Sequence, residues 1–173
     1  MGRRGSEVAS RGWREQYDRM MRWHARLSES TSVDDRRVDE FYAFFTCSFH
    51  LKDWLTADLP AASGIEADVE AFVNGRLWLK LCADIANGSK HFRLDRRRFD
   101  AQARVELATV SFEPTGFSPG FQTDEMIVVP AGGTAWEAIT VANGCVRAWK
   151  EFLAGKGLLR SEPNWPSPSA PSS

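Results

Sequence analysis

Two short segments carry an unusual density of side chains that can donate or accept protons. The first is CSFHLKDW at residues 47–54, and the second is CADIANGSKH at residues 82–91. Together they contain two of the three histidines of the chain, two aspartates and two lysines, within stretches that otherwise have the composition of a buried core. If the two segments meet in the fold, these groups form a candidate active or binding site.

The first segment places an imidazole and a carboxylate on one face of a predicted helix. His50 and Asp53 are three residues apart, so the carboxylate could orient the imidazole for proton transfer. A pair of this kind can equally satisfy itself at a seam between helices without any chemical role.

The second segment ends a predicted helix with polar and basic residues. Asn87 and Gly88 tolerate the left-handed conformation that closes a helix, and Ser89 could cap a following turn. Lys90 and His91 would then lie at a helix start, where free backbone amides favour an anion. The residues predicted to be catalytic are therefore His50, Asp53, Lys90 and His91.

An arginine cluster follows the second segment immediately, at Arg93, Arg96, Arg97 and Arg98. Such a cluster could hold phosphate groups, although a solvated helix face that also carries Asp95 and Asp100 explains the same pattern. The residues predicted to bind a ligand are Asn87, Ser89, Arg93, Arg96 and Arg97.

A metal site is an alternative use of the same side chains. Imidazoles and carboxylates on facing helices suit iron, manganese or zinc, and the candidate ligands are His50, Asp53, Asp84 and His91. Helical two-metal sites normally contain more carboxylates and a Glu-x-x-His pair. The chain also lacks HExxH, CxxC and a glycine-rich phosphate loop, so no cofactor is expected.

Apolar periodicity predicts four main helices, near residues 10–29, 36–57, 64–87 and 134–155. Asp34 or Asp35 is expected to cap the second helix, while Ser63 with Glu66 and Thr134 with Glu137 resemble capping boxes. His24 belongs to the apolar stripe of the first helix. It is expected at the edge of the core with one ring nitrogen bonded, outside the site.

Residues 104–112 and 126–129 are rich in β-forming side chains and predict a hairpin before the last helix. Phe117 and Phe121 in its long turn could cover a pocket, dock to another subunit or simply anchor the loop. The predicted fold is mainly α, a four- to five-helix bundle with a small β-hairpin inserted near 104–130. It forms one domain over 1–159, followed by a disordered proline- and serine-rich tail at 160–173.

Composition limits the partners. Lys and Arg total 22 against 23 Asp and Glu, so there is no global basic field, and any contact with nucleic acid must be local. Three widely spaced cysteines predict a reduced, cytoplasmic setting. No run approaches the roughly 18 apolar residues of a membrane span, so no membrane association is expected.

The helix order, with HLKDW on the second helix and NGSKH at the end of the third, resembles the HEPN superfamily of small helical bundles. The two motifs are also similar to those of uncharacterised bacterial proteins that carry HLKDW and ANGSKH. This resemblance covers about residues 36–98. In HEPN ribonucleases an arginine precedes a histidine by a few residues in a dimer cleft, which implies that His91 acts on RNA. The arginine positions hold Asp84, Ile85 and Ala86 here, leaving Lys90 or Arg93 to supply the cation.

Three hypotheses follow from these observations. The first is a HEPN-like RNA-associated protein, a ribonuclease or a toxin or defence component, in which His91 is the acid or base beside Lys90. The second is a non-catalytic binding or regulatory bundle, a homodimer, whose polar motifs fix helix register. The third is a metal-dependent enzyme with the His and Asp site above. Whether the protein is an enzyme stays open among them.

Overall fold

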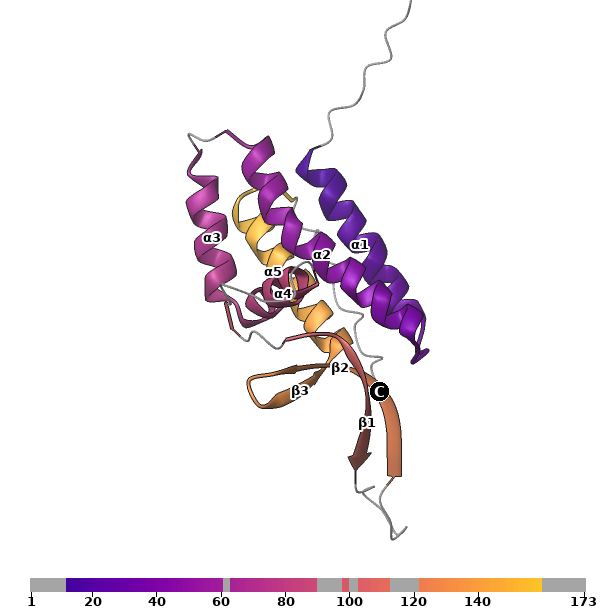
Figure 1. The fold of residues 1–173 in the computed structure, drawn as a ribbon. Helices are drawn as coiled ribbons and strands as arrows, with labels where there is room; N and C mark the ends of the chain where they lie inside the picture. Colours follow the sequence, from indigo (N-terminus) through magenta and orange to yellow (C-terminus); the bar gives the residue numbers. More distant parts are fainter. Residues whose placement is uncertain (1–11, 61–62, 90–97, 100–102, 113–121, 160–173) are drawn as a thin grey trace, which may run out of the picture.

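The computed structural model describes residues 12–60, 63–89, 98–99, 103–112 and 122–159, without the side chains of 110–112 and 122–123. Within them the chain forms five helices and a small antiparallel sheet that precedes the last helix, which confirms the predicted fold class (Figure 1). The elements in chain order are α1 Trp13–Glu29, α2 Asp35–Asp58, α3 Ile65–Gly75, α4 Leu77–Gly88, β1 Glu106–Phe112, β2 Gln122–Ala131, β3 Thr134–Glu137 and α5 Ala138–Gly155.

Helix α2 is the central helix of the bundle and contacts each of the other four described helices. Its sequence is apolar around much of its circumference, and Phe44, Phe45 and Leu51 are fully buried. Full burial of a large apolar side chain stabilises a fold by about 1.5–3 kcal/mol, so this helix supplies a large part of the core. None of the described helices combines the length with the apolar character needed to cross a membrane.

Asp34, one of the two residues predicted to cap α2, is its N-terminal cap. The Asp34 carboxylate accepts a hydrogen bond of 2.7 Å from the backbone amide of Arg37. His24 on α1 also lies as predicted, half-buried beside Phe44 with its Nε2 atom 2.7 Å from Oδ1 of Asn143. Both side chains therefore have structural roles.

The capping box expected at Ser63 and Glu66 does not form. Gly64 precedes α3 in the left-handed conformation at φ 68°, and the Ser63 hydroxyl donates to the carbonyl of Pro60 instead. The Ser63 hydroxyl therefore bonds within the turn that begins at Pro60 and does not cap α3.

The predicted helix over 64–87 is also wrong, because the chain breaks it into α3 and α4. Arg76 lies between them in an extended conformation, φ −117° and ψ 120°, directly after Gly75, a poor helix former. Most of α4 is apolar around its whole circumference. If α3 continued straight through Arg76, part of this apolar surface would be exposed to solvent. The break turns α4 into the bundle, where it contacts α2, α3 and α5.

The sheet contains a third strand that the sequence interpretation missed. Gly132 and Gly133 have φ values of 59° and 77° and form a tight turn between β2 and β3. Two successive residues with positive φ favour a two-residue hairpin turn, because its twist matches that of the flanking strands. Thr134 and Glu137 consequently belong to β3 and form no capping box, and α5 begins at Ala138.

Helix α5 approaches α4 closely at a glycine. A Cβ atom built at Gly144 would lie closer than 3.0 Å to three atoms of the Trp78 ring, whereas one built at Gly155 on the same helix meets nothing within 4 Å. The contact between α4 and α5 therefore requires the absence of a side chain at Gly144.

Replacing Gly144 with alanine should force the Trp78 ring or the helix to move. We expect Gly144→Ala to lower the free energy of unfolding by about 1–3 kcal/mol, measured by urea titration. Gly155→Ala is the matched control and should cost nothing, since alanine favours helix and the site is open. Equal effects of the two substitutions would contradict the close contact.

Candidate functional site

The structure describes five of the sequence-predicted site residues. His50 and Asp53 lie on α2, Asp84 and Asn87 lie on α4, and Ser89 follows α4 directly. The other predicted site residues, Lys90, His91, Arg93, Arg96 and Arg97, lie outside the described residues, as do Phe117 and Phe121 of the hairpin turn.

Asp84 connects α4 to the chain that follows it. Its side chain is fully buried, and its two carboxylate oxygens accept hydrogen bonds from the backbone amides of Arg98 at 2.7 Å and Phe99 at 2.6 Å. A buried carboxylate without such donors would be very costly, so these bonds hold residues 98–99 against α4.

Arg98 lies where α2, α3 and α4 meet. Its guanidinium donates to Glu70 Oε1 at 2.5 Å and to the Asn74 side chain, both on α3, and lies 5.8 Å from the Phe49 ring on α2. The predicted binding residues include Arg93, Arg96 and Arg97 but not Arg98. In the structure Arg98 joins the chain beyond α4 to α3, a role that the adjacent residues in the sequence do not indicate.

The HLKDW motif joins the same network through Lys52. The Lys52 ammonium lies 3.1 Å from Asp53 and 3.6 Å from Glu70, and 5.2 Å from the centre of the Phe49 ring. Asp53 is more than half exposed, and its described partner is Lys52. The half-buried His50 ring lies beside Phe49, with the ring centres 6.3 Å apart.

Glu70 stays ionised within this network. Burial opposes its charged form, but the hydrogen bond and charge of Arg98, with the charge of Lys52, outweigh burial and lower the pKa of the Glu70 carboxyl. The network therefore links α2, α3 and the segment beyond α4 through matched charges at neutral pH.

Helix α4 ends where predicted, at Gly88, but not with the expected left-handed cap. Gly88 is not among the described glycines with positive φ, and Ser89 has a right-handed helical conformation. The Ser89 hydroxyl donates to the Ala86 carbonyl at 2.7 Å, which satisfies one of the free carbonyls at the helix end. Asn87 is half-buried beside it.

Phe99 is one of two large apolar side chains that remain exposed in the described part of the chain. It is 41 % exposed, and the Lys80 ammonium lies 5.6 Å from the centre of its ring. Lys80 and Asp84 are four residues apart on α4, so one helix face holds both the backbone and the ring of Phe99. Lys80 forms no ion pair with any residue that the structure describes.

The described members of the predicted metal site do not form one. No group of three His, Cys, Asp or Glu side chains among the described residues is placed to hold a metal ion. Both oxygens of Asp84 already accept backbone hydrogen bonds, and Asp53 lies beside the Lys52 ammonium.

The cysteines are structural in the described core. Burial raises the pKa of the Cys145 thiol well above its ordinary value, with a further contribution from the neighbouring Cys82 thiol. The Cys82 thiol donates to the carbonyl of Phe45, and the Cys145 thiol donates to that of Trp78. Burial likewise raises the pKa of Cys47. Protonated thiols of this kind are poor nucleophiles.

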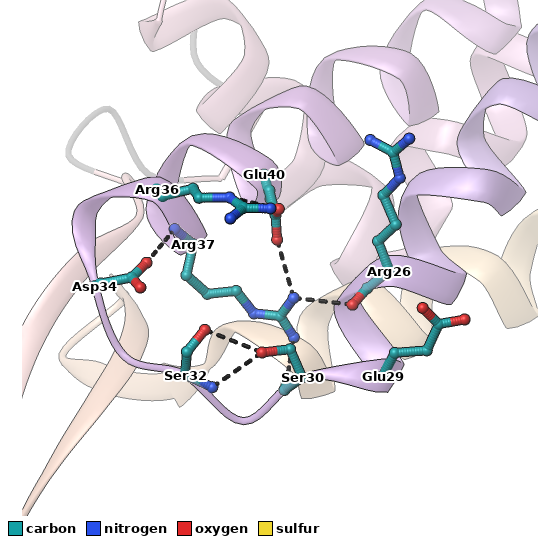
Figure 2. Close-up of a pocket in the computed structure, with 8 residues that line it drawn as sticks. All are labelled: Arg26, Glu29, Ser30, Ser32, Asp34, Arg36, Arg37 and Glu40. Atoms are coloured by element: carbon teal, nitrogen blue, oxygen red, sulfur yellow. Dashed lines mark hydrogen bonds and ion pairs between the residues drawn. The ribbon is translucent and has the colours of Figure 1, made fainter.

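A separate polar pocket of about 290 Å³ lies at the connection between α1 and α2 (Figure 2). At its base the buried Arg37 guanidinium donates to the carbonyls of Arg26, Leu27 and Ser30 and to the Glu40 carboxylate. These carbonyls belong to the last turn of α1 and the residue after it, where a helix lacks internal donors. Arg37 therefore closes the end of α1. The sequence does not indicate that Arg37, and not the adjacent Arg36, has this role. The lining residues are Arg26, Glu29, Ser30, Ser32, Asp34, Arg36, Arg37 and Glu40.

Comparison of the chain with protein-family models, with curated proteins and with solved structures found no match.

Removing the Arg37 guanidinium should leave three carbonyls without their donor and take one of its two cationic partners from Glu40. We expect Arg37→Met to lower the free energy of unfolding by about 2–4 kcal/mol, measured by chemical denaturation. Arg36→Met is the adjacent control, because the Arg36 side chain is 86 % exposed, and it should change stability by less than about 0.5 kcal/mol. A small effect at Arg37 would mean that water replaces its bonds.

Proposed function

We propose that the protein is a HEPN-like RNA-associated protein that contacts single-stranded RNA beside the end of α4. The observation that supports this most directly is the exposed Phe99 ring next to the Lys80 ammonium, held in place by the buried Asp84 carboxylate. An aromatic face beside a cation is the combination with which proteins stack unpaired bases and contact the neighbouring phosphate.

The anchoring of the chain on both sides of the basic segment supports the proposal further. The chain leaves the described structure after Ser89, at the end of α4, and returns at Arg98, which is bonded to Asp84 on the same helix. Asp84 and Ser89 are separated by about 7.5 Å along the helix axis. Lys90, Arg93, Arg96 and Arg97 occupy the interval in sequence, and we propose that their charges bind RNA phosphates.

The basic side chains near α4 fall into two groups, those that pair with carboxylates and those that do not. Arg98 and Lys52 are matched by Glu70 and Asp53, so they contribute mainly to the structure. Lys80 has no matching carboxylate among the described residues. With a net charge of −1 for the whole chain, RNA binding would depend on such local cations.

Binding can be measured by fluorescence anisotropy with a labelled single-stranded RNA over a series of salt concentrations. Phe99→Leu should weaken binding about 5- to 150-fold, because stacking contributes about 1–3 kcal/mol per base. Lys80→Gln should reduce the slope of log K against log salt by about 0.7, the loss of one phosphate contact. Melting curves should confirm that both variants remain folded.

Arg147→Gln provides the control for the loss of a positive charge. Arg147 is exposed on α5 and forms no ion pair with a described residue, so this variant should bind as the unmodified protein does. Equal weakening by Arg147→Gln and Lys80→Gln would indicate non-specific attraction and would count against a site at α4.

Catalysis is the further part of the proposal, with His91 as the proton donor or acceptor and Lys90 beside it. If the protein cuts RNA, His91→Ala should slow cleavage by about 10²–10⁴-fold, as followed on gels with labelled RNA. His24→Gln is the control, because that ring lies at the core edge against Asn143 and should not affect the rate. A His91→Ala protein that cuts at the original rate would exclude this role.

A non-catalytic binding or regulatory bundle is the second candidate. It is favoured by the complete pairing of the described interior, where no buried side-chain nitrogen or oxygen lacks a hydrogen-bond partner. A network of this kind fixes helix register and leaves few groups available for chemistry. RNA binding without cleavage in the same experiments would favour this candidate.

A further inference from the structure

The strands β1 and β2 form a ribbon that extends away from the helices (Figure 1). The base of the ribbon is covered, since Ile127, Val128 and Val129 are buried, whereas Asp124 and Glu125 nearer the start of β2 are exposed. A two-stranded ribbon is marginally stable in water unless further strands or a helix support it. The outer part of this ribbon therefore lacks support from the described helices.

Strand β1 is an edge of the sheet, because the order of the described strands is β1, β2, β3. It pairs with β2 continuously from Glu106 to Phe112 without a bulge. Its sequence, ELATVSF, contains no proline and no lysine, which are the residues that usually prevent an edge strand from pairing with another chain. Leu107 on this strand is 43 % exposed.

We propose that β1 is a dimerisation edge, at which it pairs antiparallel with β1 of a second copy of this chain. A two-fold axis at Thr109 would place Leu107 opposite Ser111 and Glu106 opposite Phe112. The strand carries one charge, which Arg104 already pairs at 2.6 Å, so no like charges meet across the axis. The two three-stranded sheets become one sheet of six strands.

The acidic residues on β2 do not oppose this arrangement. In the joined sheet the two β2 strands are separated by three strand spacings, about 14 Å. This distance exceeds the screening length of about 8 Å at physiological salt, so Asp124 and Glu125 of the two copies repel each other weakly. A strand of seven residues buries less than a standard interface, and the dimer is therefore expected in the micromolar range. This inference is independent of the proposed RNA function.

Sedimentation velocity of the full chain between about 1 and 500 μM tests the proposal, a range chosen to span the expected micromolar affinity. The unmodified protein should convert from monomer to dimer within this range, whereas Thr109→Lys should stay monomeric. Thr134→Lys is the matched control, because Thr134 is exposed on β3 at the opposite edge of the sheet, and it should still dimerise. Melting curves at low concentration should show that both lysine variants are folded.

A cysteine variant tests the position of the two-fold axis. Residues directly opposite each other in antiparallel strands have Cβ atoms about 4.5–5.5 Å apart. Thr109→Cys should therefore form a disulfide-linked dimer with oxidised glutathione, and Thr134→Cys should not. A monomer throughout the concentration range, a dimer that persists in Thr109→Lys, or a dimer lost in Thr134→Lys would overturn the proposal.

Discussion

The burial of the Asp84 carboxylate is the constraint on which the organisation of the candidate site depends. A charge placed in the interior must be matched by donors, and here the donors are the backbone amides of Arg98 and Phe99. The chain beyond α4 must therefore return to that helix. This return brings the Arg98 guanidinium to α2 and α3, and it places the Phe99 ring beside Lys80. One buried carboxylate thus links four separate parts of the chain.

Matched charges in this protein serve mostly to join elements. Arg37 closes the end of α1 and pairs with Glu40, while Arg98 and Lys52 meet at Glu70 between α2 and α3. Such groups contribute little to long-range attraction, because each cation lies beside a carboxylate. Lys80 differs from them in forming no ion pair with a described residue and in lying beside an aromatic ring, that of Phe99, that is exposed. This difference, and not the number of basic residues, makes the surface beside α4 the best candidate for a polyanionic ligand.

The proposed RNA surface and the proposed dimerisation edge use different parts of the same architecture. The first lies where the helices converge, and the second lies on the ribbon that extends away from them. They are joined through the start of β1, where the Tyr42 hydroxyl on α2 bonds both the amide and the carbonyl of Val105. Helix α2 therefore supports the candidate site directly and fixes the base of the edge strand.

The sequence by itself determined the helical class, the Asp34 cap and the core-edge position of His24, because apolar periodicity and local hydrogen bonds act over a few residues. It also identified the two polar motifs. Gly132 and Gly133 also carry a local hairpin signal, which the interpretation of Thr134 and Glu137 as a capping box missed. Only the tertiary structure decided the break at Arg76 and the roles of Asp84, Arg98 and Lys80. These features depend on contacts between residues far apart in the chain, and side-chain types alone do not specify which distant partner a carboxylate or a cation will meet.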